Sequence, residues 1–170
     1  MTRYVALLRA VNVGGTGTLA MADLRAMAEA AGFARVETYI ASGNLVLESD
    51  LGPKQVQAAL EARLRAHAGK PVGVIVRSGP ELAAVLAASP FADADPKHAY
   101  VFFLDQPPPE DALAGVSGRQ DEQIAWGSQE IYVHYPAGMG RSKLKIPAAK
   151  IATARNLNTV AKLVEMATRP

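Results

Sequence analysis

The sequence predicts an α+β fold made of two pseudo-duplicated ferredoxin-like halves, which are split βαβ units whose antiparallel sheets are covered by helices. Short runs of apolar and β-branched residues, typical of strands, alternate with segments that repeat apolar residues at helical spacing. In the first half the order is strand, helix, strand, strand, helix, strand, which is the split βαβ plan. The second half repeats this order loosely, without a clear last strand.

Local patterns define the elements of the first half. Leu24, Met27, Ala28 and Ala31 recur at helical spacing, and Gly32 follows them as a stop signal. Because proline suits the first position of a helix, we expect a second helix to begin at Pro53. The predicted elements are, in order, a strand over 4–11, a helix around 24–31, a strand over 36–41, a turn at 42–44, a strand over 45–48, a helix over 53–64 and a strand over 71–76.

The second half is predicted with the same rules. Three prolines at 107–109 lead into Glu110 and Asp111, which suit the positive N-terminal end of a short helix. The other predicted elements are a helix over 81–88, a strand over 99–104, a hairpin of 124–126 and 131–135 around Gly127 and Ser128, and a terminal helix around 157–164. We therefore expect a first half over residues 1–78 and a second over 79–170, closely packed together.

Composition restricts the class of protein. At 170 residues, with 49% hydrophobic and 20% charged residues, the chain is typical of globular proteins. It has no cysteine, which excludes disulfides, thiolate metal sites and cysteine nucleophiles. The N-terminus lacks the long apolar core of a secretory signal, and no apolar run approaches the roughly 20 residues of a membrane span. We therefore expect a cytoplasmic protein without a membrane partner.

Positive charge is concentrated in one segment. Residues 131–164 hold six Lys and Arg and no acidic residue, whereas residues 1–130 hold 11 Lys and Arg against 15 Asp and Glu, a net charge of −4. Such a segment attracts phosphates or carboxylates, or simply keeps a surface solvated. The sequence thus indicates an anion-binding surface and leaves the anion open.

Two polar loops are expected to lie side by side in the first half. A crossover helix joins the first two strands, so these strands run parallel and their C-terminal ends share one edge of the sheet. Glycine loops there can also simply serve turns. The candidate binding residues on this rim are Arg9, Asn12, Gly14, Gly15, Ser42 and Asn44.

The basic segment supplies a second group of candidate residues. Arg141, Ser142 and Lys143 form a run rich in hydrogen-bond donors, and Arg155 and Asn156 directly precede the terminal helix. A helix N-terminus with an arginine beside it suits an anion. The alternative is a helix capped by Asn156 or Asn158 with solvated basic neighbours. The binding hypothesis requires both groups of residues to meet at one hollow.

No pattern identifies catalytic residues. Ser142 and Lys145 match the serine–lysine acylation spacing, but its companion motifs S-D-N and K-T-G are absent. The three histidines are far apart and form no metal-ligand spacing, so no metal site is expected. The catalytic residues and any cofactor therefore stay unknown at this point.

Short motifs spread over most of the chain resemble those of one bacterial family. They are Tyr4 to Gly15, Met21 to Arg25, Thr38 to Asn44, Val74 to Arg77, Ser89 to Phe91, Ser142 to Leu144 and Thr153 to Val160. Together they are similar to the family called domain of unknown function 1697. The resemblance implies a duplicated ferredoxin-like α+β fold and names no activity.

Three functions remain open from the sequence. The first is binding of a phosphate-bearing ligand, a nucleotide or nucleic acid, in a polar, basic cleft. The second is an enzyme that acts on a small anionic metabolite, with Arg155 or Lys143 holding the anion. The third is a homo-oligomeric structural or interaction protein, with a homodimer as its simplest form. We favour the first.

Overall fold

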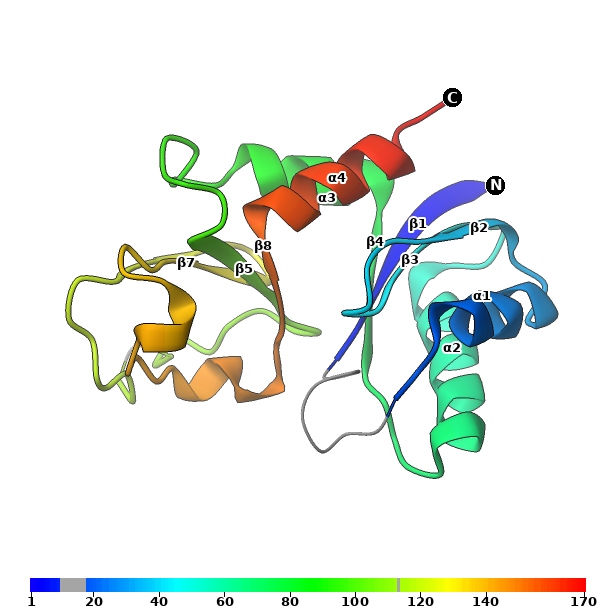
Figure 1. The fold of residues 1–170 in the computed structure, drawn as a ribbon, viewed down its shortest axis with the longest axis horizontal. Helices are drawn as coiled ribbons and strands as arrows, with labels where there is room; N and C mark the ends of the chain where they lie inside the picture. The colour runs from blue at the N-terminus through cyan, green and yellow to red at the C-terminus, as the bar shows by residue number, and fades with distance from the viewer. Residues whose placement is uncertain (10–17, 113) are drawn as a thin grey trace. The chain divides into compact units, whose positions relative to one another are not determined.

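The computed structural model describes residues 1–9, 18–112 and 114–170. The chain divides into two compact units, Met1–Ala83 with Lys162–Pro170 and Ala84–Ala161. Each unit carries one four-stranded sheet (Figure 1). The boundaries between the units fall within two helices, α3 (Gly79–Ala87) and α4 (Leu157–Ala167).

The first unit has the predicted ferredoxin-like topology. Its elements are β1 (Thr2–Leu8), α1 (Met21–Ala30), β2 (Ala34–Thr38), β3 (Asn44–Ser49), α2 (Pro53–Ala68) and β4 (Val74–Ser78). The strand order is β2-β3-β1-β4, and all neighbouring strands pair antiparallel. Both β1 and β2 are therefore antiparallel to β3, so they run in the same direction, as the crossover helix requires.

The core of the first unit lies between its sheet and two helices. Tyr4, Ala6 and Leu8 alternate along β1 and point to one face of the sheet. Helices α1 and α2 cover that face (Figure 1). Their buried residues in this core are Leu24 and Ala28 of α1 and Val56, Leu60 and Leu64 of α2.

Helix α2 has clear signals at both ends. Pro53 occupies its first turn, and the Gly52 N–H donates to Gln55 Oε1 at 3.0 Å. The helix ends at Gly69, whose φ of 73° is left-handed and whose N–H donates to the Arg65 carbonyl at 2.9 Å. The prediction of this helix is thereby confirmed, with its end four residues later than expected.

Strand β2 ends earlier than the sequence predicts. Its pairing with β3 is irregular between Ala34 and Glu37, and Arg35 has a φ of 46°. Ile40 adopts a φ of 51°, which is left-handed and cannot continue a strand. The turn to β3 therefore begins before Ala41, the residue at which the strand was expected to end.

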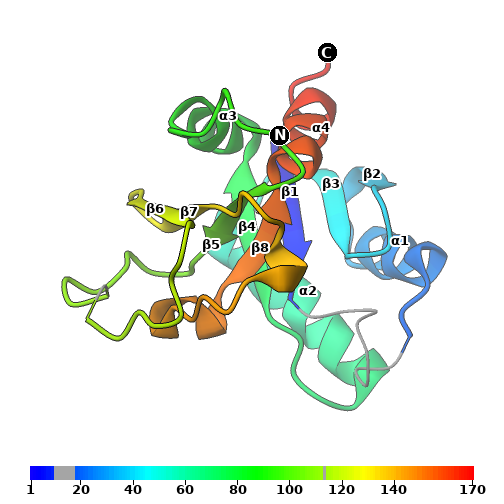
Figure 2. The ribbon, with the colours of Figure 1, turned by 60° about the vertical axis from the view of Figure 1, so that its left-hand side comes forward.

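The second unit repeats the strand order of the first. Its strands are β5 (Ala99–Phe103), β6 (Gln123–Trp126), β7 (Glu130–His134) and β8 (Thr153–Asn156), and the order in the sheet is β6-β7-β5-β8. Strand β5 lies between β7 and β8 (Figure 2). When the strands of each sheet are numbered in chain order, the second pairs with the third, the third with the first, and the first with the fourth in both sheets. This order agrees with the predicted pseudo-duplication, and the α+β class is confirmed.

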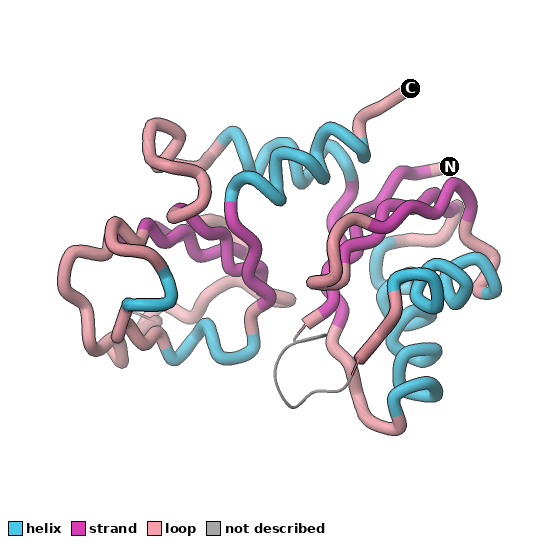
Figure 3. The backbone as a smooth tube through the Cα atoms, in the orientation of Figure 1, coloured by secondary structure: helices cyan, strands magenta, loops and turns pink. Residues whose placement is uncertain are grey.

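Two expectations for the second half are wrong. Residues 110–112 form turns, not the start of a helix, and a last strand does exist, because β8 runs directly into α4. Two 3₁₀ helices, Met139–Arg141 and Pro147–Ile151, come between the third and fourth strands of this unit, the place in chain order that α2 takes in the first unit. Helical segments are drawn in cyan in Figure 3. The turns follow a run of three prolines, which cannot donate backbone hydrogen bonds. The predicted hairpin and the terminal helix are confirmed.

Both faces of the second sheet are buried. One face carries Phe102, Ile131 and Val133, which pack with Tyr135 and Ile146 in one apolar cluster. The opposite face carries Val101, Phe103 and Tyr132, all buried. The Tyr132 hydroxyl donates to the Val85 carbonyl at 2.7 Å, which fastens this face to α3.

Candidate functional site

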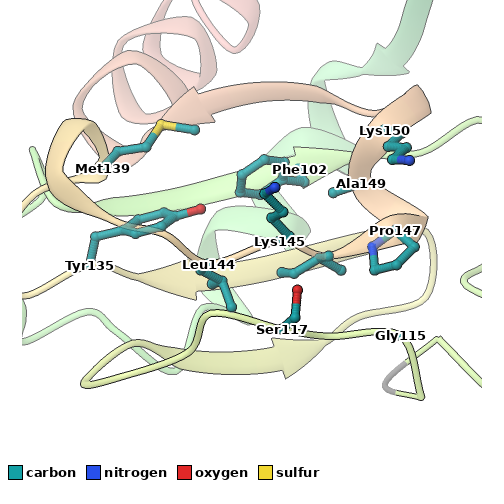
Figure 4. Close-up of a pocket in the computed structure, with 11 residues that line it drawn as sticks. Phe102, Gly115, Ser117, Tyr135, Met139, Leu144, Lys145, Pro147, Ala149 and Lys150 are labelled. Atoms are coloured by element: carbon teal, nitrogen blue, oxygen red, sulfur yellow. The ribbon is translucent and has the colours of Figure 1, made fainter.

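The second unit contains a cavity of about 380 Å³ beside the Phe102 face of its sheet (Figure 4). This volume lies within the range of small-molecule sites, roughly 300–1,000 Å³. The apolar side chains that line it are Phe102, Met139, Leu144, Ile146, Pro147 and Ala149. They come from β5, from the two 3₁₀ helices and from the segment between these helices. The cavity is therefore mainly apolar, and it lies entirely within the second unit.

Four residues with polar side chains also line the cavity. They are Ser117, Tyr135, Lys145 and Lys150. Ser117 and the two lysines are exposed, whereas Tyr135 is 5% exposed. The Tyr135 hydroxyl points toward the interior of this group of side chains (Figure 4). The cavity thus combines apolar walls with two cations and two hydroxyls.

Tyr135 is held as a neutral phenol. Burial raises the pKa of Tyr135 to about 12, and the nearby Glu122 carboxylate and Tyr100 add to the rise. The Tyr100 ring meets the Tyr135 ring edge to face, with centroids 5.7 Å apart. At neutral pH the phenol therefore keeps its proton and can donate a hydrogen bond.

Ser117 and Lys145 are paired directly across a two-residue antiparallel bridge. The Ser117 N–H donates to the Lys145 carbonyl at 3.0 Å, and the Lys145 N–H donates to the Ser117 carbonyl at 2.8 Å. Residues paired in this way project their side chains to the same side of the ribbon. The bridge therefore presents a hydroxyl and an ammonium group to the cavity together.

A second contact fastens the same two segments. The Ser142 hydroxyl donates to Glu122 Oε2 at 2.5 Å, and the Gln120 N–H donates to Glu122 Oε1 at 2.6 Å. These hydrogen bonds hold the pKa of Glu122 below its ordinary value, and the bond from Ser142 has the largest effect. The Leu144 N–H donates to Ser142 Oγ at 3.1 Å, so Ser142 links the carboxylate to the cavity wall.

The predicted residues of the basic segment lie in different surroundings. Arg141 and Lys143 are exposed and are not part of the cavity lining. Arg155 is 7% exposed and pairs with Val101 in the sheet, so it belongs to the face opposite Phe102. Burial lowers the pKa of Arg155 to about 10, and its Nη1 donates to the Ala154 carbonyl at 2.8 Å.

Asn156 and Ser142 already make structural hydrogen bonds. Asn156 Oδ1 accepts from the Thr159 N–H at 2.9 Å, which is the geometry of an N-cap on α4. Asn156, not Asn158, therefore caps this helix. Because the Ser142 hydroxyl donates to Glu122, the spacing of Ser142 and Lys145 reflects no serine–lysine pair.

Of the predicted residues of the first unit, Ser42 lies in the turn after β2 and Asn44 is the first residue of β3. The Leu8 N–H donates to the Gly43 carbonyl at 2.9 Å, so the end of β1 lies against the turn after β2. Asn44 is fully buried, and its Nδ2 donates to the Tyr39 carbonyl at 2.8 Å and to Ser42 Oγ at 3.0 Å. Its amide thus closes the turn.

The neighbouring residue Arg9 is exposed, and its N–H donates to the Gly73 carbonyl at 2.9 Å. Asn12, Gly14 and Gly15 lie outside the described residues. The meeting of this rim with the basic segment at one hollow stays a prediction.

Sequence reasoning did not select the four polar residues of the cavity as site residues. Lys150 was recognised only as part of the basic segment, and Lys145 was recognised there and in its spacing from Ser142. Ser117 gave no signal, because its pairing with Lys145 joins segments 28 positions apart. Alternation along β7 could have identified Tyr135, since it continues the row of Ile131 and Val133 on the Phe102 face.

Other kinds of site find no support in the described part of the chain. Among residues 1–9, 18–112 and 114–170, no group of three His, Cys, Asp or Glu side chains could hold a metal ion. Within those same residues, no helix has the length and apolar character needed to cross a membrane.

Comparisons with known proteins identify the family. The sequence model of the family described as "Protein of unknown function (DUF1697)" matches residues 1–132. The chain belongs to this family. The resemblance inferred from the motifs is thereby confirmed. The match ends before Tyr135 and the basic lining residues of the cavity, so the family model does not cover most of the site.

A solved structure extends the likeness to nearly the whole chain. The conserved bacterial protein SP0830 from Streptococcus pneumoniae is 26% identical, with a TM-score of 0.82, over 98% of this chain and 99% of that chain. No curated protein matches the sequence. The comparisons thus support the family and the fold, and they name no activity.

Proposed function

We propose that the protein binds a small phosphate-bearing ligand, such as a nucleotide, in the cavity of the second unit. The observation that carries this proposal is the combination of apolar walls with Lys145 and Lys150 around one small cavity. Apolar walls with a few placed polar groups are typical of ligand sites, and ammonium groups bind phosphate as point charges.

The electrostatics of the segment favour an anion. Residues 131–164 hold six Lys and Arg and no acidic side chain, so this segment carries a net positive charge. Glu122 is buried, and its two carboxylate oxygens accept hydrogen bonds from Gln120 and Ser142. In the described residues Lys145 has no ion-pair partner, so its charge can serve a ligand.

Binding is better supported than catalysis. The cavity's titratable group with a shifted pKa is Tyr135, and its pKa rises away from neutrality, to about 12. A general base needs a pKa near the working pH, which this phenol does not have. An enzyme acting on a small anionic metabolite is therefore the weaker alternative.

Calorimetric titration with adenosine 5′-monophosphate tests the proposal. Lys145→Met should weaken binding about tenfold, which corresponds to about 1.4 kcal/mol. Lys143→Met is the matched control. It removes the same charge from a lysine that lies two positions before Lys145 and does not line the cavity. Affinity should also fall as salt rises. Equal effects of the two substitutions, or no binding by the wild-type protein, would contradict the proposal.

Nucleic acid is a second candidate ligand, and the exposure of Arg141 and Lys143 favours it. Cations outside a small cavity suit the extended backbone of a single strand. Binding of a single-stranded oligonucleotide across a salt series tests this version, since phosphate contacts make affinity fall with salt. A double variant, Arg141→Gln with Lys143→Gln, that loses oligonucleotide binding would favour nucleic acid over the nucleotide as ligand, provided that Lys145→Met keeps that binding.

The homodimer and the cytoplasmic location stay predictions.

A further inference from the structure

The bridge between Ser117 and Lys145 has the chemistry of a head-group site. Both side chains line the cavity and project from the same side of the ribbon. Among the described residues, neither the Ser117 hydroxyl nor the Lys145 ammonium has a hydrogen-bond or ion-pair partner. A phosphate oxygen accepts from both kinds of donor, and its negative charge matches the ammonium. The two groups together therefore suit a phosphomonoester.

A separate donor lies within the cavity. The Tyr135 hydroxyl points toward the interior, and in the described part of the chain it has no hydrogen-bond partner. This phenol is protonated at neutral pH, as tyrosine ordinarily is, and burial raises its pKa further, to about 12. A ligand that covered the hydroxyl without an acceptor would leave a buried donor unsatisfied, which is costly. The ligand should therefore carry an acceptor atom where it meets Tyr135.

Apolar side chains line the rest of the cavity. Phe102 belongs to the apolar cluster of the sheet, and Leu144 and Ile146 alternate with Lys145 along one segment. Lys145 and the two apolar residues beside it therefore supply a charge and a wall from three consecutive positions. A matching ligand has a phosphate, an apolar body and an acceptor on that body.

Resting on the proposed function, we infer that the ligand is a phosphomonoester whose apolar body carries a hydrogen-bond acceptor, as in a nucleoside monophosphate. Ser117 and Lys145 hold the phosphate, and the Tyr135 hydroxyl donates to the acceptor. Ser117 and Tyr135 are thus specificity-determining residues for two different parts of the ligand.

Two probes separate these roles. Adenosine 5′-monophosphate has a phosphate and ring-nitrogen acceptors, whereas phenyl phosphate has the phosphate and an apolar ring without an acceptor. Titration calorimetry with Ser117→Ala should show weaker binding of both probes, by about three- to tenfold, the value of one hydrogen bond. Tyr135→Phe should weaken the binding of adenosine 5′-monophosphate by a similar factor and leave the affinity for phenyl phosphate unchanged.

Matched controls isolate each hydroxyl. Ser128→Ala removes an exposed serine hydroxyl of the same unit outside the lining, and Tyr100→Phe removes the hydroxyl of the ring packed against Tyr135. Both should leave the two affinities unchanged. Unchanged thermal unfolding of Ser117→Ala and Tyr135→Phe checks that the fold is kept.

The outcomes separate this inference from the proposed function. If neither probe binds the wild-type protein, the proposed function fails. If adenosine 5′-monophosphate binds but Tyr135→Phe changes both affinities equally or neither of them, the assignment of Tyr135 is wrong while the cavity remains a binding site. Failure of phenyl phosphate alone to bind would also contradict the inference, because its phosphate and ring retain all the other contacts.

Discussion

The Ser142 hydroxyl donates a hydrogen bond of 2.5 Å to the Glu122 carboxylate, which joins two loops 20 residues apart. The same carboxylate accepts from the Gln120 N–H at 2.6 Å. Both donors favour the ionised form, and this explains why the pKa of Glu122 lies below its ordinary value of 4.5. The contact fixes the segment that leads to Lys145, so it also shapes the candidate site.

Glu122→Gln should remove part of the pH dependence of stability. A carboxyl group with a lowered pKa in the folded state stabilises the protein fully above pH 4.5, and this contribution is lost as pH falls through the lowered value. The substitution should therefore destabilise the protein at neutral pH and have a smaller effect in acid. Urea unfolding between pH 7 and pH 3 measures the difference. Glu110→Gln, at an exposed turn, is the control and should show no such trend.

Gly118→Ala should be strongly destabilising. Gly118 has a φ of 70°, and a Cβ there would overlap the carbonyl oxygen of Lys143. Left-handed backbone costs an alanine about 1–2 kcal/mol, and overpacking adds about 1–3 kcal/mol. Urea midpoints should show a loss of about 3 kcal/mol. Gly69 has a φ of 73°, and a Cβ added there would meet no atom within 4 Å, so Gly69→Ala should show only the backbone cost. Equal losses in the two variants would contradict the steric argument.

The first unit was predictable because its local signals agree with its topology. Pro53 marks the start of α2, and the continuous apolar run of β1 matches a strand whose residues Tyr4 to Leu8 are all buried. Ile40 is an exception, because no sequence rule places a β-branched residue in left-handed backbone.

The second unit was less predictable because its important pairings are not local. Strand β8 has only four residues, and its alternation places Arg155 on a buried face, so it gives no apolar pattern. The bridge that joins Ser117 to Lys145 depends on the folds of two loops, and neither loop has a repeating pattern. The basic segment was recognised from its charge, but charge alone does not indicate which cations line a cavity.

Asn156→Ala should destabilise the protein by about 1 kcal/mol, the usual cost of losing an N-cap. The Thr159 N–H would lose its acceptor, Asn156 Oδ1, which lies at 2.9 Å. Asn156→Asp should restore most of the stability, because its carboxylate accepts the same hydrogen bond. Asn158→Ala, at an exposed position of the same helix, is the control. An alanine variant as stable as the wild-type protein would show that the cap contributes little.

Ile40→Asn should stabilise the protein by about 1 kcal/mol. Ile40 is 49% exposed, so little apolar burial is lost, and its φ of 51° is unfavourable for a β-branched residue. Asparagine tolerates this conformation well. Ile40→Val keeps the β-branch and should show no gain. Thermal unfolding of the three proteins compares them directly, and a gain in the valine variant would mean that backbone strain is not the cause.

Thr153→Val should also stabilise the protein. Thr153 is 2% exposed, and in the described residues its Oγ1 is buried without a hydrogen-bond partner. A buried hydroxyl without a partner costs about 1–3 kcal/mol, and valine replaces it with a methyl group of similar shape. Valine also suits a strand. Thr153→Ser is the opposite control, because it keeps the hydroxyl and deletes the methyl group, so it should be less stable than the wild-type protein. A lower urea midpoint for Thr153→Val than for the wild-type protein would mean that the Thr153 hydroxyl has a hydrogen-bond partner in solution.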